Sequence, residues 1–148
     1  MSLIFRVLDQ HVIHGLADET AILDERGAMS YAELLHESAS IAGALRNLGL
    51  APGALLHLDL PDSRELTIAL LASARIGVLP RAGADFQLSG SPPALRTPDT
   101  EVPWDLMIRA GRTDPAPAPD EDAEGYESLM RHAYADIFSI LEAGGVIS

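Results

Sequence analysis

The sequence predicts an α/β fold, in which helices flank a small, partly parallel sheet. An apolar run at 54–60 is followed by a helical pattern at 62–77 and a second apolar run at 78–79. Strand, helix and strand with short connections favour a right-handed crossover and a parallel pair. Helical patterns at 3–14 and 31–48 precede this unit. A proline-rich segment and a C-terminal amphipathic helix complete the prediction.

The first predicted helix covers residues 3–14, where apolar residues recur at helical spacing, and Gly15 is suited to end it. A short apolar run at 21–23 follows. The turn-like residues 24–27 and the apolar pair 28–29 come next, so we expect a small hairpin or strand-turn unit here.

The helix predicted over residues 31–48 has the clearest start in the chain. Ser30 can accept a hydrogen bond from the backbone of Glu33, whose carboxylate can reach back to the amide of Ser30, which is a capping box. The helix carries one apolar stripe, and Gly49 supplies a left-handed residue to close it.

The strand at 54–60 places two polar side chains, His57 and Asp59, on one face. A central parallel strand should be apolar on both faces, so this pattern indicates that one sheet face is open to solvent. The pair could form a base and its orienter, or half of a metal site. We favour a hydrogen-bonded or solvated surface pair, because no nucleophile is linked to it.

The following helix is expected to begin with Asp62 or Ser63 as its cap, to carry Glu65 in its first turn and to end at Gly77. Another pair of titratable side chains, His11 and His14, lies near the end of the first helix. Such a pair could bind a metal ion with an outside carboxylate, but favourable contact with the helix dipole is far commoner.

The segment 86–119 contains seven of the ten prolines and is predicted to be mostly extended or irregular. Residues 104–108 are expected to form one short strand within it. The run 114–119, in which proline alternates with other residues, is typical of a semi-rigid polyproline linker.

Residues 120–148 predict one C-terminal amphipathic helix, with acidic residues at 120–122 near its start and glycines at 144–145 at its end. Its wide apolar face allows two interpretations: it folds back over the sheet, or it docks a second copy or a partner protein. The candidate interface residues are Tyr126, Met130, Tyr134, Ile137, Phe138 and Leu141.

Composition excludes several classes of function. The chain has 22 acidic residues, ten arginines and no lysine, and its formal charge is -12, so nucleic acid and anionic membranes are improbable partners. With no cysteine, disulfides, thiolate catalysis and cysteine-ligated zinc are excluded. Without lysine there is also no side-chain amine for gripping phosphate or forming a Schiff base.

The predicted organisation has three parts: an α/β region at 1–85, the proline-rich segment at 86–119 and the C-terminal helix at 120–148. No run is long and apolar enough for a membrane helix, and the N-terminus lacks the pattern of a secretory signal. We therefore expect a cytoplasmic protein.

Five motifs follow one another in residues 1–85: Thr-Ala-Ile-Leu-Asp, Met-Ser-Tyr-Ala-Glu-Leu-Leu, Ala-Leu-Arg-Asn-Leu-Gly-Leu-Ala-Pro-Gly, Leu-Pro-Asp-Ser-Arg-Glu and Ala-Arg-Ile-Gly-Val-Leu-Pro. In this order they resemble the opening of the adenylate-forming enzymes, which include acyl-CoA synthetases, AMP-dependent ligases and the adenylation domains of peptide synthetases. Two departures stand within them: Asp62 replaces the usual Asn, and residues 81–83 replace a Pro-Leu stretch.

The resemblance implies a scaffold that packs beside an active site. The family's Ser/Thr/Gly-rich phosphate loop, nucleotide-orienting segments and lid lysine have no counterpart here, and residues 89–92 are best interpreted as an ordinary turn. We therefore expect no catalytic, cofactor-binding or metal-binding residues and no cofactor for this chain alone.

Three hypotheses follow from the sequence. The first is a truncated, non-catalytic relative that acts as an interaction or regulatory module, as a homodimer or with a partner protein bound through the C-terminal helix. The second is the N-terminal piece of a split AMP-forming ligase completed by another chain. The third, and weakest, is an enzyme built on His57 and Asp59.

Overall fold

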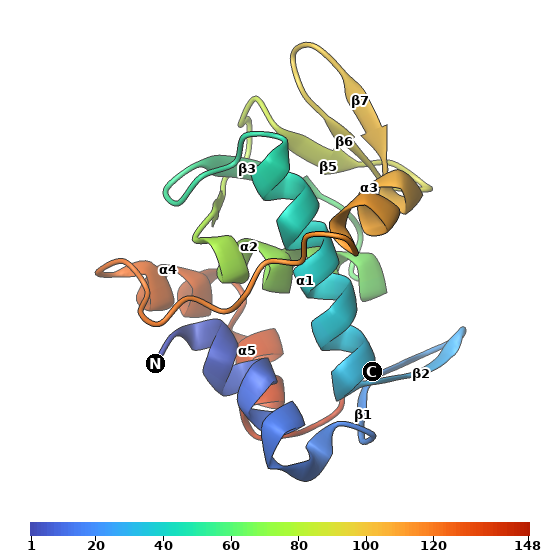
Figure 1. Ribbon diagram of the computed structural model, residues 1–148, viewed down its shortest axis with the longest axis vertical. Coiled ribbons are helices and arrows are strands. Elements are labelled where there is room, and N and C mark those ends of the chain that lie inside the picture. The colour runs from blue at the N-terminus through green and yellow to red at the C-terminus, as the bar shows by residue number, and fades with distance from the viewer. The chain divides into compact units, whose positions relative to one another are not determined.

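The computed structural model describes residues 1–148, which form two compact units. Unit 1 combines Met1–His36 with Ala118–Ser148, and unit 2 is Glu37–Pro117. These limits differ from the three expected parts at 1–85, 86–119 and 120–148. That division, which rests on composition and resemblance, stays a prediction. Figure 1 shows the elements of each unit. None of the helices combines the length and apolar character that a membrane span requires.

The N-terminal part of unit 1 begins with a helix over residues 3–16 that contains two π-helical stretches, η1 (Phe5–Asp9) and η2 (Val12–Leu16). It kinks near its end, where Gly15 has a φ of 102°, a value that favours glycine. The predicted hairpin is confirmed, because β1 (Thr20–Asp24) and β2 (Gly27–Ser30) pair antiparallel.

The capping box is confirmed at the start of α1 (Tyr31–Asn47). The Ser30 hydroxyl accepts from the Glu33 amide at 3.1 Å, and the Glu33 carboxylate accepts from the Ser30 amide at 3.1 Å. These contacts satisfy amides that have no partner inside the helix. The helix then continues from unit 1 into unit 2.

The prediction of one C-terminal helix is wrong. The structure has α4 (Tyr126–Ala133) and α5 (Ala135–Glu142), separated at Tyr134, whose φ of -138° and ψ of 49° are not helical. The buried residues Tyr126, Met130, Phe138 and Leu141 keep helical spacing across the break, so the sequence does not mark it. The acidic run 120–122 also lies before the first turn of α4, whose cap is Gly125.

The two parts of unit 1 share a core and a short strand contact. Helix α5 packs on η1 (Figure 1). The Ile147 amide donates to the Ala21 carbonyl, and the Leu23 amide donates to the Ile147 carbonyl, both at 2.8 Å. The C-terminal end therefore pairs in parallel with β1. The fully buried apolar residues of this unit include Leu3, Ile4, Val7, Leu8, Leu34, Phe138 and Leu141.

Unit 2 contains a five-stranded sheet in the order β4-β3-β5-β6-β7. The predicted parallel crossover is confirmed, because β3 (Leu55–Asp59) runs parallel to β4 (Leu79–Pro80). Strand β3 is also parallel to β5. The other strands are β5 (Gln87–Ser89), β6 (Ala94–Arg96) and β7 (Glu101–Pro103).

The segment 86–119, predicted to be mostly extended or irregular, contains three paired strands that the sequence did not reveal. Strands β5, β6 and β7 form an antiparallel meander. Each strand has only three residues, which is too short to show an alternating pattern, and the prolines lie in the turns or at strand ends.

Helix α2 (Arg64–Ile76) connects β3 to β4 and has the expected ends. The Ser63 hydroxyl accepts from the Leu66 amide at 3.2 Å, so Ser63 rather than Asp62 is the cap. Gly77 closes the helix with a φ of 73°.

The strand expected at 104–108 is instead helix α3 (Trp104–Gly111). The extended Pro103 precedes it, and the buried residues Met107, Ile108 and Gly111 follow a helical period. Helix α3 crosses α1 very closely, because a Cβ at Gly111 would lie 1.8 Å from the carbonyl oxygen of Ser40.

Residues 112–117 lie against the helices of unit 2. A Cβ at Gly43 would lie 2.0 Å from the Asp114 carbonyl oxygen. Ala116 is 2% exposed; its amide donates to the Ala39 carbonyl at 3.0 Å, and its carbonyl accepts from Arg75 at 3.5 Å. The first half of the expected proline linker is therefore bound by unit 2.

Candidate functional site

The register of four strands gathers polar side chains on one face of the sheet. His57 pairs with Gln87, and Asp59 pairs with Ser89. Because alternate residues of a strand point to opposite faces, the residues opposite one another in register share a face. The face that we call the polar face carries His57, Asp59, Gln87, Ser89, Arg96 and Glu101.

The opposite face belongs to the core. Leu58, Leu88 and Leu95 are in register there, and the last two are 0% exposed. On the polar face, Asp59, Arg96 and Glu101 are exposed and His57 is half-buried. The sequence-based expectation of one solvated sheet face agrees with this difference.

The polar face pairs its side chains with one another. The Gln87 amide donates to the Asp59 carboxylate at 3.3 Å, and Arg96 donates to the Ser89 hydroxyl at 3.0 Å. Arg96 also forms an ion pair with Glu101. No hydrogen bond joins His57 to Asp59, so the structure does not assemble a base with an orienting carboxylate.

The second histidine pair is also separated by the structure. His11 Nε2 lies 2.7 Å from the Leu141 carbonyl oxygen, so in this contact it is the donor, and its ring makes a T-shaped contact with the Tyr31 ring. His14 is exposed at the kink after it. The structure contains no group of three or more His, Cys, Asp or Glu residues that could hold a metal ion.

Most of the candidate interface residues are buried within their own chain. Tyr126, Met130, Phe138 and Leu141 are 4% exposed or less. Tyr134 and Ile137 are half-buried. The apolar stripe thus fills a core, and its role in docking another protein stays a prediction.

Two buried phenols belong to this core. Burial raises the pKa of Tyr31 to about 12, and burial together with the charge of Asp122 raises the pKa of Tyr126 well above its ordinary value. The Tyr31 hydroxyl donates to the Gly145 carbonyl at 2.6 Å. Both phenols are therefore neutral at physiological pH, and they are part of the core of unit 1.

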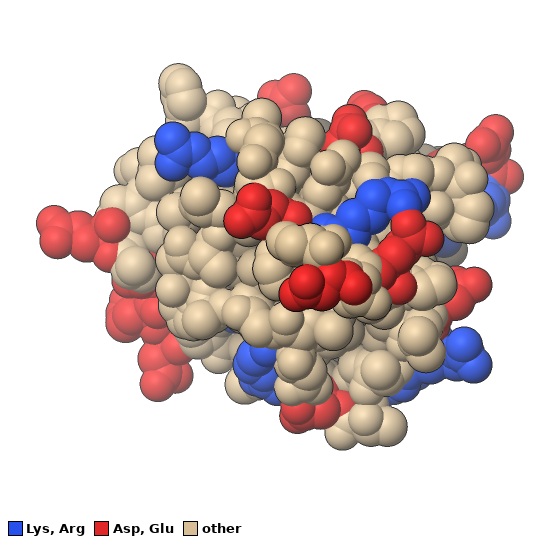
Figure 2. Space-filling model, turned by 90° about the horizontal axis from the view of Figure 1, so that it is seen from above, with Lys and Arg blue, Asp and Glu red and all other residues tan.

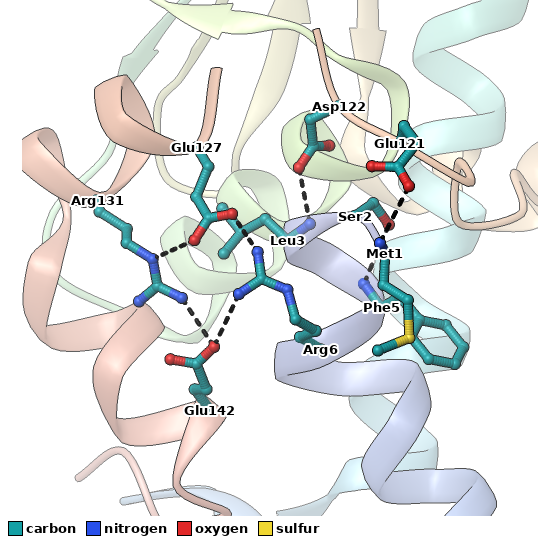
Figure 3. A network of polar contacts seen from close by, with 10 residues as sticks. All are labelled: Met1, Ser2, Leu3, Phe5, Arg6, Glu121, Asp122, Glu127, Arg131 and Glu142. Carbon is teal, nitrogen blue, oxygen red and sulfur yellow. Dashed lines mark hydrogen bonds and ion pairs between the residues drawn. The ribbon is translucent and has the colours of Figure 1, made fainter. Parts of the chain in front are cut away.

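Four alternating charges connect the two parts of unit 1 (Figure 3). Arg6 pairs with Glu127 and Glu142, and Arg131 reaches the same two carboxylates at 2.8 Å. We call these four residues the charge cluster. Burial alone would raise the pKa of Glu127, but hydrogen bonds from Arg131 and Arg6 hold it below its usual value. The hydrogen bond that Arg131 donates to Glu127 raises the pKa of Arg131.

Sequence reasoning missed the charge cluster. The spacing of Glu127 and Arg131 is a known sign of a helical ion pair, but nothing in the sequence connects Arg6 to residues more than a hundred positions away. The cluster is a structural feature, since its side chains neutralise one another.

The remaining surface features are scattered charges and one hollow. Figure 2 shows acidic side chains at many separate points of the face drawn, with arginines in smaller groups between them. A hollow of about 380 Å³ in unit 1 is lined by the Met1, Phe5 and Asp9 side of the first helix and by residues 118–120. Its lining contains no grouping that indicates a reaction.

The geometry defines an α/β scaffold with a polar sheet face that is paired within itself. Sequence comparison identifies its relatives: the AMP-binding enzyme family matches residues 9–81. The acetyl-coenzyme A synthetase of Deinococcus radiodurans is 40% identical over 80 residues, which are 51% of this chain and 12% of that protein. The Mycobacterium bovis acetyl-coenzyme A synthetase is 34% identical over 85 residues, 53% of this chain and 13% of that protein.

Structural comparison extends the likeness beyond the part that matches in sequence. An artificially fused adenylation-PCP di-domain from Klebsiella oxytoca has a TM-score of 0.62 and 18% identity, and the match covers 80% of this chain and 26% of that chain. This comparison shows the fold alone. Because 80% of the chain is more than residues 1–85, the fold likeness includes part of the segment after residue 85.

Residues 9–81 of this chain are a member of the adenylate-forming superfamily and correspond to its N-terminal region. The match spans about an eighth of the length of the curated relatives.

Proposed function

We propose that this chain is a non-catalytic relative of the AMP-forming ligases that acts in the cytoplasm as an interaction or regulatory module. The polar face is the observation that carries the proposal. Its charged and amide side chains bind one another, and this leaves no arranged nucleophile, base or phosphate contact.

The basic residues give further support. All ten are arginines, whereas the resemblance assigns the lid chemistry to a lysine. Arg96, the arginine of the polar face, pairs with Glu101 and Ser89. We propose that the chain alone uses no cofactor, and that its partners are proteins rather than nucleic acid or membranes, because its net charge is -12.

The melting temperature in Mg-ATP tests the proposal. A ligand at about a hundred times its Kd stabilises the folded state by about 2.7 kcal/mol, which raises the melting temperature of a chain this size by about 5–10 °C. We expect no shift beyond that of Mg²⁺ alone. The Mg²⁺ control is needed because any cation can stabilise an acidic chain, and a further rise with ATP would contradict the proposal.

A second candidate function is the N-terminal piece of a split ligase. The fold likeness covers most of this chain but only 26% of the adenylation chain, so another chain would have to supply the other segments. Mixing this protein with a ligase that lacks this region would then restore pyrophosphate release. Activity of the mixture above that of either chain alone would favour this function over the first.

A further inference from the structure

Unit 1 is built from two segments that are far apart in the chain, residues 1–36 and 118–148. The first segment continues directly into unit 2 through α1. The second follows unit 2 in the chain, directly after Pro117. We call residues 118–148 the exchange segment, because its contacts with the first segment are all non-covalent.

The contacts between the two segments are numerous and specific. Asp122 accepts from the Leu3 amide at 2.8 Å, and the charge cluster joins Arg6 to Glu127 and Glu142. Further hydrogen bonds to the exchange segment are made by His11, Tyr31, Ala21 and Leu23 of the first segment. A second copy of the chain carries the same first segment, so it offers the same set of contacts.

The exchange segment needs such a partner surface in order to fold. Helices α4 and α5 have eight residues each, and isolated helices shorter than about 12–15 residues are marginal in water. Helix α5, which carries the buried Phe138, packs on η1, so the first segment of one copy or another is needed to cover it.

The connection before the exchange segment is short and stiff. The Ala116 amide donates a hydrogen bond to the Ala39 carbonyl in unit 2, and Asp122 accepts one from the Leu3 amide in unit 1. Only residues 117–121 lie between them, and two of these are prolines, which hold the backbone extended. Short hinges favour exchange of a segment between copies, because a short hinge is strained in the closed monomer and the exchanged arrangement relieves that strain.

We propose that two copies of this chain exchange residues 118–148, so that the exchange segment of each copy completes unit 1 of the other. The exchange makes the proposed interaction function specific, because the partner is a second copy of the same chain. It does not depend on whether the chain binds nucleotide, so the failure of either idea can be told from the failure of the other.

A charge-swap mixing experiment tests the exchange. Arg6→Glu leaves three negative charges and one positive charge in the charge cluster of that variant, whereas Glu127→Arg leaves three positive and one negative. In an exchanged heterodimer of the two variants, both clusters contain two charges of each sign. The variants should fold, since the four side chains are 28–39% exposed and such pairs contribute little individually.

The mixture is refolded together and analysed by native mass spectrometry, with one variant isotopically labelled. We expect the heterodimer to form about tenfold more tightly than either variant's homodimer. We also expect the wild-type dimer to weaken when a Gly-Ser spacer is inserted after Ala118, because a longer hinge allows the closed monomer. A wild-type chain that stays monomeric as its concentration is raised would overturn the proposal, and so would a dimer indifferent to the charge swap.

Discussion

The two units of this protein are held together in different ways. Unit 2 is one continuous stretch in which backbone segments lie in close contact, as at Gly111 and Ser40 and at Gly43 and Asp114. Unit 1 joins two distant segments through ion pairs and single hydrogen bonds in addition to its apolar core. The difference indicates that steric fit controls unit 2, whereas pH and charge also affect unit 1.

The largest effect is expected from Gly111→Ala in unit 2. The added Cβ would lie 1.8 Å from the Ser40 carbonyl oxygen. Because Gly111 belongs to α3 and Ser40 to α1, the backbone of one helix would have to move. We expect a loss of about 3 kcal/mol in the free energy of unfolding, measured by urea denaturation. Arg109→Ala, an exposed change on the same helix, is the control and should cost less than about 0.5 kcal/mol.

Tyr31 makes unit 1 sensitive to alkali. Its pKa is raised to about 12 in the folded protein, so its stabilising effect is complete below pH 10 and is lost as the pH rises toward 12. The loss amounts to about 2–3 kcal/mol. Tyr31→Phe should cost about 1 kcal/mol near neutral pH and remove this part of the alkaline loss. If the free energy of unfolding fell equally with rising pH in the wild type and in Tyr31→Phe, the alkaline loss would not come from Tyr31.

The capping box should give a smaller effect at the start of α1. Ser30→Ala removes the acceptor of the Glu33 amide and should lower the free energy of unfolding by about 1 kcal/mol. Ser30→Asp, which keeps an acceptor at the cap, is the matched control and should recover most of the loss. Thermal unfolding followed by circular dichroism measures both.

The charge cluster should give the smallest effect. The pKa of Glu127 is lowered in the folded state, so its contribution is present above the ordinary carboxyl pKa of about 4.3 and is lost as the pH falls through the lower folded value. Because the pairs are partly exposed, Glu127→Gln should cost less than about 1 kcal/mol at neutral pH. High salt should weaken the wild type more than the variant, whereas equal salt responses would argue against the cluster.

Much of unit 2 and the start of α1 could be predicted because their signals are local. The capping pair Ser30 and Glu33 lies within four residues, Gly77 ends its helix by its own φ, and the crossover follows from element order. The polar face was also expected from the alternation of His57 and Asp59 along one strand.

Other features depend on contacts that no local pattern shows. Strands β5 to β7 are stabilised by pairing with β3 and with one another, and Trp104 begins a helix because of the packing of Met107 and Ile108. The break at Tyr134 interrupts an apolar period that remains continuous. The partners of Asp59 and Arg96, which decide how the polar face is interpreted, also required the three-dimensional structure.

The central proposal is that this chain has the scaffold of an adenylate-forming enzyme and does not bind nucleotide by itself. Calorimetric titration with Mg-ATP tests it most directly, with the acetyl-coenzyme A synthetase of Deinococcus radiodurans as the positive control. The account predicts heat of binding for the synthetase and none above dilution for this protein. A saturable binding isotherm for this chain alone would contradict it.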